Sequence, residues 1–120
     1  MKTATFPVKR ANPRFPSSAE AEAIFRDGTS VDAQVLEISS HGCYIDTLEP
    51  IPVGTELQLR INNGTSTCEL RGKVIYMHPG HGMAIAGMGV VFHDMASEQR
   101  SAIETWLRDL AANQSKSSPS

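Results

Sequence analysis

Three positively charged side chains lie close together near the start of the chain, in the segment VKRANPRFPSS. They are Lys9, Arg10 and Arg14, and every charged residue before Glu20 is basic. The whole chain has a formal net charge of -2, so the segment is a local basic arm on a mildly acidic protein. Arginine binds phosphate through paired, charge-assisted hydrogen bonds. The pattern therefore predicts one local anionic partner and does not indicate binding to bulk nucleic acid.

A second group of polar residues lies in the segment LEISSHGCYI. Side chains alternate between the two faces of a strand, so the spacing predicts that Glu37 and Ser39 share a face. Gly42 follows where a tight connection between strands needs a residue without a side chain. We therefore expect a polar ledge outside the core, with a carboxylate, a hydroxyl and open backbone amides.

The sequence offers little for catalysis or for metal binding. It lacks the G-x-S-x-G pattern of a nucleophile elbow, and the glycines of PGHGMAIAGMG are not followed by the Lys-Ser/Thr of a phosphate-binding loop. His78 and His81 flank a Pro-Gly turn without the spacing of a closed zinc site. We expect a binding protein and not an enzyme, with no metal and no cofactor beyond its ligand.

Length and composition fit one ordinary globular domain. The 120 residues can form a single modest core. No apolar run approaches the length of a signal peptide or of a membrane span, which needs about 20 residues, so we expect a cytoplasmic protein. Cys43 and Cys68 lie in alternating apolar stretches without metal or redox spacing, and we expect both to be buried free thiols.

Alternation of polar and apolar residues dominates the chain as far as residue 93 and predicts six strands. Turn signals separate them, the clearest being Asp27-Gly28 and Asn62-Asn63-Gly64. The expected strands are residues 19–25, 30–39, 43–46, 55–61, 67–77 and 89–93. Within residues 67–77, the alternation places Cys68, Leu70, Val74 and Tyr76 in one phase.

The period changes after residue 94 and predicts one amphipathic helix within residues 95–113. Its apolar residues recur at helical spacing, and Asp94 and Ser97 are candidate caps. The apolar positions are Ile103, Trp106, Leu107 and Leu110, with Trp106 as the expected core anchor.

Together these elements predict a mainly β protein, a small six-stranded antiparallel β-barrel with one C-terminal α-helix. Closure into a barrel removes the exposed edges that an open sheet of six strands would leave. We expect residues 1–14 to form a flexible basic arm and residues 15–113 to form the barrel and helix. Residues 114–120 are expected to be a disordered polar tail.

Two short motifs in this order resemble a known family. Residues 10–14 read R-x-x-x-R and residues 37–42 read E-x-S-x-x-G. With the six strands and the final helix, they resemble the two signatures of PilZ domains, the bacterial receptors for cyclic di-GMP. The segment GMGVVFHDMASEQRSAIETWL also resembles the family's last strand and helix. The resemblance implies a split-barrel fold and a cyclic di-GMP site formed by Lys9, Arg10, Arg14, Glu37, Ser39 and Gly42.

The ligand's chemistry agrees with these residue types. Arginine can bind its phosphates or stack on its bases, and a carboxylate can accept the guanine N–H groups. The basic arm then acts as a clamp that folds over the ligand. Glu37 departs from the family pattern, which has Asp or Asn there, and it keeps the charged acceptor while adding one methylene.

Plain structural interpretations stay open for each residue taken singly. Glu37 could be a solvated carboxylate at a strand end, and Ser39 could be a turn hydroxyl bonded to its own backbone. The arginines could belong to an ordinary basic tail.

Two functions from different classes follow. The first is a stand-alone cyclic di-GMP receptor that relays the signal to an unidentified effector protein. The second is a PilZ-like adaptor that binds proteins and not the nucleotide. A barrel that binds single-stranded nucleic acid is a distant third, because Tyr44, Tyr76 and Phe92 look too few and too scattered for a stacking platform.

Overall fold

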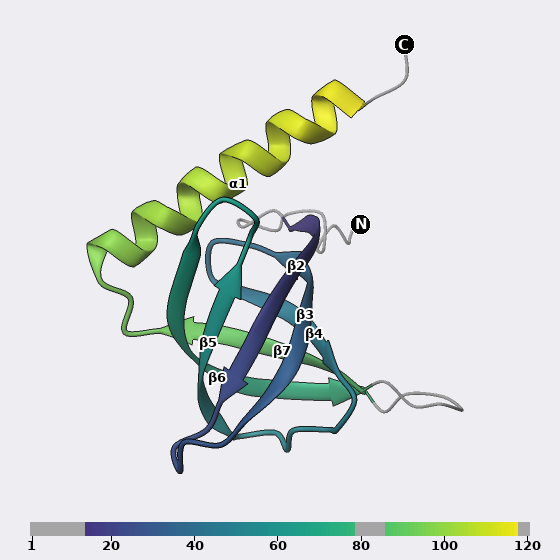
Figure 1. Ribbon diagram of the computed structural model, residues 1–120, viewed down its shortest axis with the longest axis vertical. Coiled ribbons are helices and arrows are strands. Elements are labelled where there is room, and N and C mark those ends of the chain that lie inside the picture. The colour runs from purple at the N-terminus through teal and green to yellow at the C-terminus, as the bar shows by residue number, and fades with distance from the viewer. Residues whose placement is uncertain (1–13, 79–85, 118–120) are drawn as a thin grey trace, which may run out of the picture.

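The computed structural model describes residues 14–78 and 86–117 and contains six strands and one helix. All strand pairs are antiparallel, and the strands close into a barrel in the order β2-β3-β4-β7-β6-β5 (Figure 1). The predicted six-stranded barrel with a C-terminal helix is therefore confirmed. The elements are β2 (Phe15–Ile24), β3 (Ser30–Ile38), β4 (Gly42–Thr47), β5 (Glu56–Asn62), β6 (Thr67–His78), β7 (Ala86–His93) and α1 (Ser97–Ser117).

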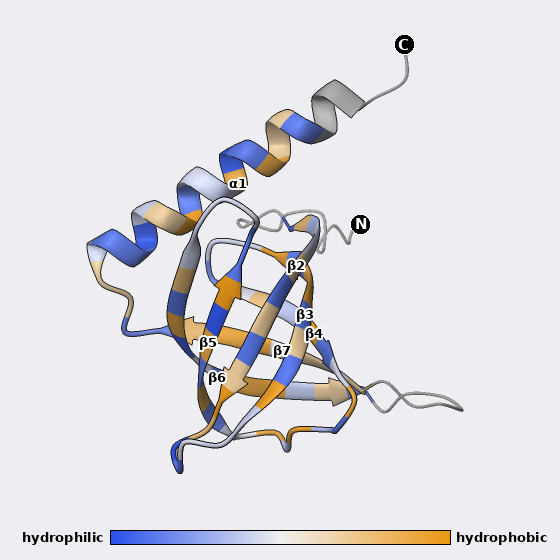
Figure 2. Ribbon diagram, viewed as in Figure 1, coloured by the Kyte–Doolittle hydropathy of each residue, from blue (hydrophilic) through white to orange (hydrophobic). Residues whose placement is uncertain are grey.

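Alternation along the strands builds the core. Figure 2 shows hydrophobic and hydrophilic residues alternating along several of them. In β5, Leu57, Leu59 and Ile61 are buried while their neighbours face outward. Inward-facing apolar side chains from all six strands therefore meet in one core, to which the helix adds Ile103 and Trp106. Trp106 is the core anchor that its spacing predicts.

Besides a register shift in β2 between Pro16 and Ala19, bulges in β3 and β6 break the alternation and decide which side chains face outward. In β3, Val35 pairs with Ile45 and Glu37 with Tyr44, so Leu36 is an extra residue. In β6, Val74 pairs with Val90 and Tyr76 with Gly89, so Ile75 is extra and is 51% exposed. A bulge adds one residue and so shifts the phase of every residue that follows it. The prediction that Tyr76 shares the inward phase of Leu70 and Val74 is therefore wrong.

Helix α1 packs against β2 and β6, crosses one end of the barrel, and continues past it (Figure 1). At the N-terminus of α1, the hydrogen bond to a backbone amide comes from Gln99 and not from the candidate caps Asp94 and Ser97. The Gln99 Oε1 atom accepts from the Ala96 amide at 2.7 Å. The Gln99 side chain also donates to the Glu69 carbonyl at 2.7 Å, which ties the helix to β6. Residues 114–117 are helical and not part of a tail, since no Gly or Pro interrupts the sequence before Pro119.

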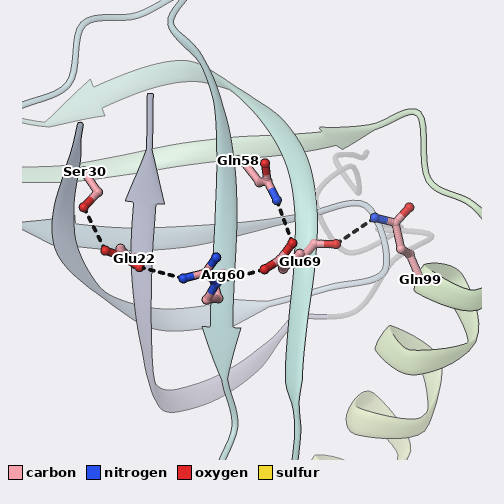
Figure 3. A network of polar contacts seen from close by, with 6 residues as sticks. All are labelled: Glu22, Ser30, Gln58, Arg60, Glu69 and Gln99. Atoms are coloured by element: carbon pink, nitrogen blue, oxygen red, sulfur yellow. Dashed lines mark hydrogen bonds and ion pairs between the residues drawn. The ribbon is translucent and has the colours of Figure 1, made fainter. Parts of the chain in front are cut away.

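An ion-pair network covers the outer face of β2, β5 and β6 beside this helix (Figure 3). Arg60 lies between two carboxylates, at 2.8 Å from Glu69 and 3.3 Å from Glu22. Ser30 and Gln58 each donate a further hydrogen bond to these carboxylates. The network pairs charges on three adjacent strands, so this face of the barrel is polar, and one guanidinium between two carboxylates leaves a single negative charge.

The two cysteines differ in burial. Cys43 faces the core and is 8% exposed, and burial raises the pKa of its thiol to about 12. Cys68 is only half-buried, so the expectation of two buried thiols holds for Cys43 alone. Burial also raises the pKa of Cys68 above its ordinary value.

These shifts predict a loss of stability at alkaline pH. A folded-state pKa above the unfolded value of 9.0 means that the folded protein keeps a proton that the unfolded chain releases. Stability is therefore full below that value and falls as the pH rises through it, by up to about 1.4 kcal/mol per pH unit from Cys43. Urea unfolding from about pH 8 to about pH 11 measures this slope. The Cys43→Ala variant should show a shallower slope than the parent, and equal slopes would contradict the assignment.

Candidate functional site

The described members of the two motifs line one pocket on the outside of the barrel. Its volume is about 220 Å³. Arg14, Glu37, Ser39 and Gly42 all border it, together with His41 from the same turn. Lys9 and Arg10 lie outside the described residues. The pocket therefore brings Arg14 together with the segment from Glu37 to Gly42, although β2 and most of β3 separate them in the sequence.

Arg14 and Glu37 form an ion pair at the edge of this pocket. Arg14 Nη1 lies 3.5 Å from Glu37 Oε1, and the two side chains are 44% and 46% exposed. The pair forms because β2 runs antiparallel to β3, with Pro16 opposite Glu37. An ion pair this exposed contributes only about 0 to 1 kcal/mol. Both groups are therefore held near each other and stay available to another partner.

Ser39 has a structural place in the turn between β3 and β4. Its backbone amide and its hydroxyl both donate to the Gly42 carbonyl, at 2.8 and 3.2 Å. The Ser39 Oγ atom in turn accepts from the His41 amide at 3.3 Å. β3 ends at Ile38, so the alternation does not continue to Ser39, which is 8% exposed. The expected polar ledge is thus corrected in two parts: Ser39 is a buried turn hydroxyl that shapes the pocket, and the His41 amide of this turn is not open, while the Glu37 carboxylate is exposed.

Gly42 is required by the approach of a neighbouring strand. A Cβ atom at Gly42 would lie 2.4 Å from the Val90 carbonyl oxygen on β7, much closer than real side chains come. Its backbone dihedral is ordinary, since Gly42 is not among the glycines with positive φ. The sequence predicts a residue free of clash at this position, and the structure identifies the β7 backbone as the atom group that would clash.

Two tyrosines border the same pocket and were missed as site residues in the sequence. Tyr44 on β4 and Tyr76 on β6 have ring centroids 6.1 Å apart, because β7 lies between these strands and presents Gly89 at their level. The expectation that the aromatics are scattered is therefore wrong for this pair, while Phe92 belongs to the core. The sequence feature that points to this pair is the presence of Gly87 and Gly89 in β7, because a glycine inside a strand often marks a place where another group lies close to the backbone.

The site holds Tyr44 in its neutral form. Burial raises the pKa of Tyr44, and the neighbouring Tyr76, Asp46 and Glu37 raise it further. Its hydroxyl lies 3.3 Å from His78 Nδ1. Tyr44 therefore carries no charge near neutral pH and keeps its proton for hydrogen bonding.

Within residues 14–78 and 86–117, no three His, Cys, Asp or Glu side chains lie together as a metal site. His81, the partner considered for His78, lies outside the described residues. Among these same residues, no helix is long and apolar enough to cross a membrane.

Comparison with known proteins identifies the family. A model of the PilZ domain matches residues 8–109, most of the chain. The chain belongs to the PilZ domain family. No curated protein sequence matches this PilZ chain.

Solved PilZ structures share the fold. The PilZ domain of YcgR from Escherichia coli, solved with c-di-GMP, is 11% identical with a TM-score of 0.76, over 90% of this chain and 95% of that one. The K. pneumonia MrkH-c-di-GMP complex is 16% identical with a TM-score of 0.79, over 90% and 55% of the two chains. The Bacillus subtilis inhibitor of motility MotI/DgrA is 14% identical with a TM-score of 0.73, over 92% and 54%. This chain thus spans about half the length of the last two.

The turn geometry predicts a stability effect at Ser39. Ser39→Ala removes a hydroxyl that donates to the Gly42 carbonyl and accepts from the His41 amide in two part-buried hydrogen bonds, so the free energy of unfolding should fall by about 0.5 to 1.5 kcal/mol. Ser40→Ala is the matched control, because its hydroxyl makes an exposed contact with His41, and it should change stability by less than about 0.5 kcal/mol. Urea denaturation measures both variants. Equal effects at the two serines would contradict the role of Ser39 in the turn.

Proposed function

We propose that this PilZ domain is a receptor for cyclic di-GMP and binds it in the pocket between Arg14, Glu37 and the Ser39–Gly42 turn. The observation that carries the proposal is the meeting of both motifs, in their described parts, around one pocket. Motifs of this kind are weak when taken singly, and they gain force when their residues converge in the fold. The c-di-GMP-bound YcgR and MrkH structures share this fold and support the same ligand.

Phosphate recognition falls to the basic residues. Arg14 borders the pocket and is only loosely held by Glu37, so its guanidinium is free to form paired hydrogen bonds with a phosphate. Lys9 and Arg10 precede it closely in the sequence, and we assign them to the same dianionic ligand. Their positive charge matches a ligand that carries two phosphate groups.

Base recognition falls to Glu37. An ionised carboxylate has two acceptor oxygens, and the guanine edge presents N1–H and N2–H donors. Glu37 points to the outside of the barrel, is 46% exposed and borders the pocket. It can therefore replace its weak contact with Arg14 by two hydrogen bonds to one base.

The proposal assigns binding and not catalysis. The thiol that borders the pocket, Cys43, has a pKa raised to about 12 by burial, so it is not a nucleophile near neutral pH. We further propose that the bound ligand changes the surface around the exposed Ile75 at the pocket rim, and that a partner protein in the bacterial cytoplasm recognises this change.

Loss of an arm arginine should weaken binding strongly. Arg10→Ala and Arg14→Ala each remove charge-assisted bonds to phosphate, so affinity for cyclic di-GMP should fall about ten- to a hundredfold in a calorimetric titration. Arg108→Ala removes the same charge from the exposed face of α1 and should bind like the parent. If both arm variants also bind like the parent, the clamp is wrong. A parent that does not bind at all would favour the adaptor function.

Substitution of Glu37 tests the base contact. Glu37→Gln keeps one acceptor oxygen and loses the charge, so it should weaken cyclic di-GMP binding. Glu37→Asp keeps the charge on the shorter side chain that is typical of the family, so it should retain affinity. The same carboxylate should make the protein prefer cyclic di-GMP to cyclic di-AMP, whose bases lack the N1 proton and the 2-amino group. Calorimetry with both ligands measures this preference. Silent substitutions together with equal binding of the two ligands would remove Glu37 from the site.

A further inference from the structure

The outer face of the barrel beside the pocket carries three aromatic rings that no core contact explains. Tyr44, Tyr76 and His78 have ring centroids 5.2 to 6.1 Å apart. Tyr44 and Tyr76 are half-buried, and both border the pocket. We call these three residues the aromatic shelf.

Glycines on β7 make room for the shelf. A Cβ atom at Gly89 would lie 2.3 Å from the Tyr76 ring, and one at Gly87 would lie 1.9 Å from the Tyr44 hydroxyl. The tyrosine side chains therefore lie directly against the β7 backbone, where any larger residue would push them away. Adjacent strands are only about 4.8 Å apart, so two rings on β4 and β6 can meet over the glycine strand between them.

The rings form a surface and do not stack on one another. The planes of Tyr44 and Tyr76 are inclined by 31°, and their centroid distance of 6.1 Å exceeds that of a face-to-face stack. One side of this surface rests on β7. The other side belongs to the pocket, where the exposed Ile75 adds an apolar edge.

A hydrogen-bond acceptor stands directly beside the shelf. Glu37 pairs with Tyr44 across β3 and β4, so its carboxylate and the Tyr44 ring occupy neighbouring places in one row. A flat, apolar surface beside a charged acceptor matches a ligand whose flat ring carries N–H donors on its edge. Tyrosine is uncharged near neutral pH, and burial raises the pKa of Tyr44 further, so the Tyr44 ring adds no negative charge to repel a phosphate.

We propose that Tyr44 and Tyr76 bind one guanine base of the ligand by stacking, while Glu37 accepts hydrogen bonds from the edge of the same base. The inference rests on the proposed function and adds residues outside both motifs to it. Stacking on an aromatic side chain tolerates any flat base, so the shelf supplies affinity and Glu37 supplies the choice of guanine.

Paired substitutions at each tyrosine separate the ring from its hydroxyl. Tyr44→Leu and Tyr76→Leu remove the ring and should each weaken cyclic di-GMP binding about five- to a hundredfold in calorimetry. Tyr44→Phe and Tyr76→Phe keep the ring and should stay within about threefold of the parent. Gly89→Val should act like the Leu variants, because its side chain displaces the Tyr76 ring.

Nuclear magnetic resonance of the unmodified protein gives an independent readout that needs no variant to fold. Titration with cyclic di-GMP, and separately with the mononucleotide GMP, should shift the ring protons of Tyr44 and Tyr76, and those of Trp106 at the helix should stay unchanged.

The outcomes distinguish the shelf from the receptor. If Arg14→Ala loses affinity while both Leu variants bind like the parent, the shelf is overturned and the receptor stands. If the parent does not bind cyclic di-GMP, the receptor fails, and the GMP titration then decides the shelf alone: shifts at the tyrosine rings support it, and unchanged rings overturn it.

Discussion

Closure of the barrel through β7 is the constraint on which the site depends. β7 pairs with β4 along one edge and with β6 along the other, so residues more than 30 positions apart come to lie in one row. That row runs from Glu37 through Tyr44 and Gly89 to Tyr76. The contact is close enough that Gly42 and Gly89 cannot carry a side chain without displacing their neighbours. The site is thus a consequence of the pairing of β7 with β4 and β6, and it would be lost without those two pairings.

The sequence predicts the fold well because alternation is a local signal. Each strand can be predicted from its own residues alone. The turns at Gly28 and Gly64 have the positive φ that their Asp-Gly and Asn-Gly pairs suggest. The bulges at Leu36 and Ile75 are different, because a bulge depends on how two strands pair and not on either strand alone. Without them, neither the outward direction of Tyr76 nor the row that contains it can be foreseen.

The two motifs also divide into residues of different kinds. Arg14 and Glu37 present exposed charges to the pocket, whereas Ser39 and Gly42 shape the backbone beside it. The hydroxyl of Ser39 already donates to one backbone group and accepts from another, so a ligand would have to compete for it. A sequence motif does not distinguish these kinds of residue, because the same serine can supply a hydroxyl that stabilises a turn or one that binds a ligand. Only the hydrogen bonds of the folded turn separate them.

The charges at the pocket also favour one orientation for the proposed ligand. At rest, Arg14 and Glu37 neutralise each other at 3.5 Å, and their exposure makes the contact weak. A phosphate next to Glu37 would meet a like charge, whereas a phosphate next to Arg14 gains a charge-assisted bond. The guanine edge has the opposite preference, because its N–H donors need the carboxylate. The proposed dinucleotide would therefore place one phosphate toward Arg14 and one base toward Glu37 on β3. The resting ion pair holds both groups close to the places that this orientation requires.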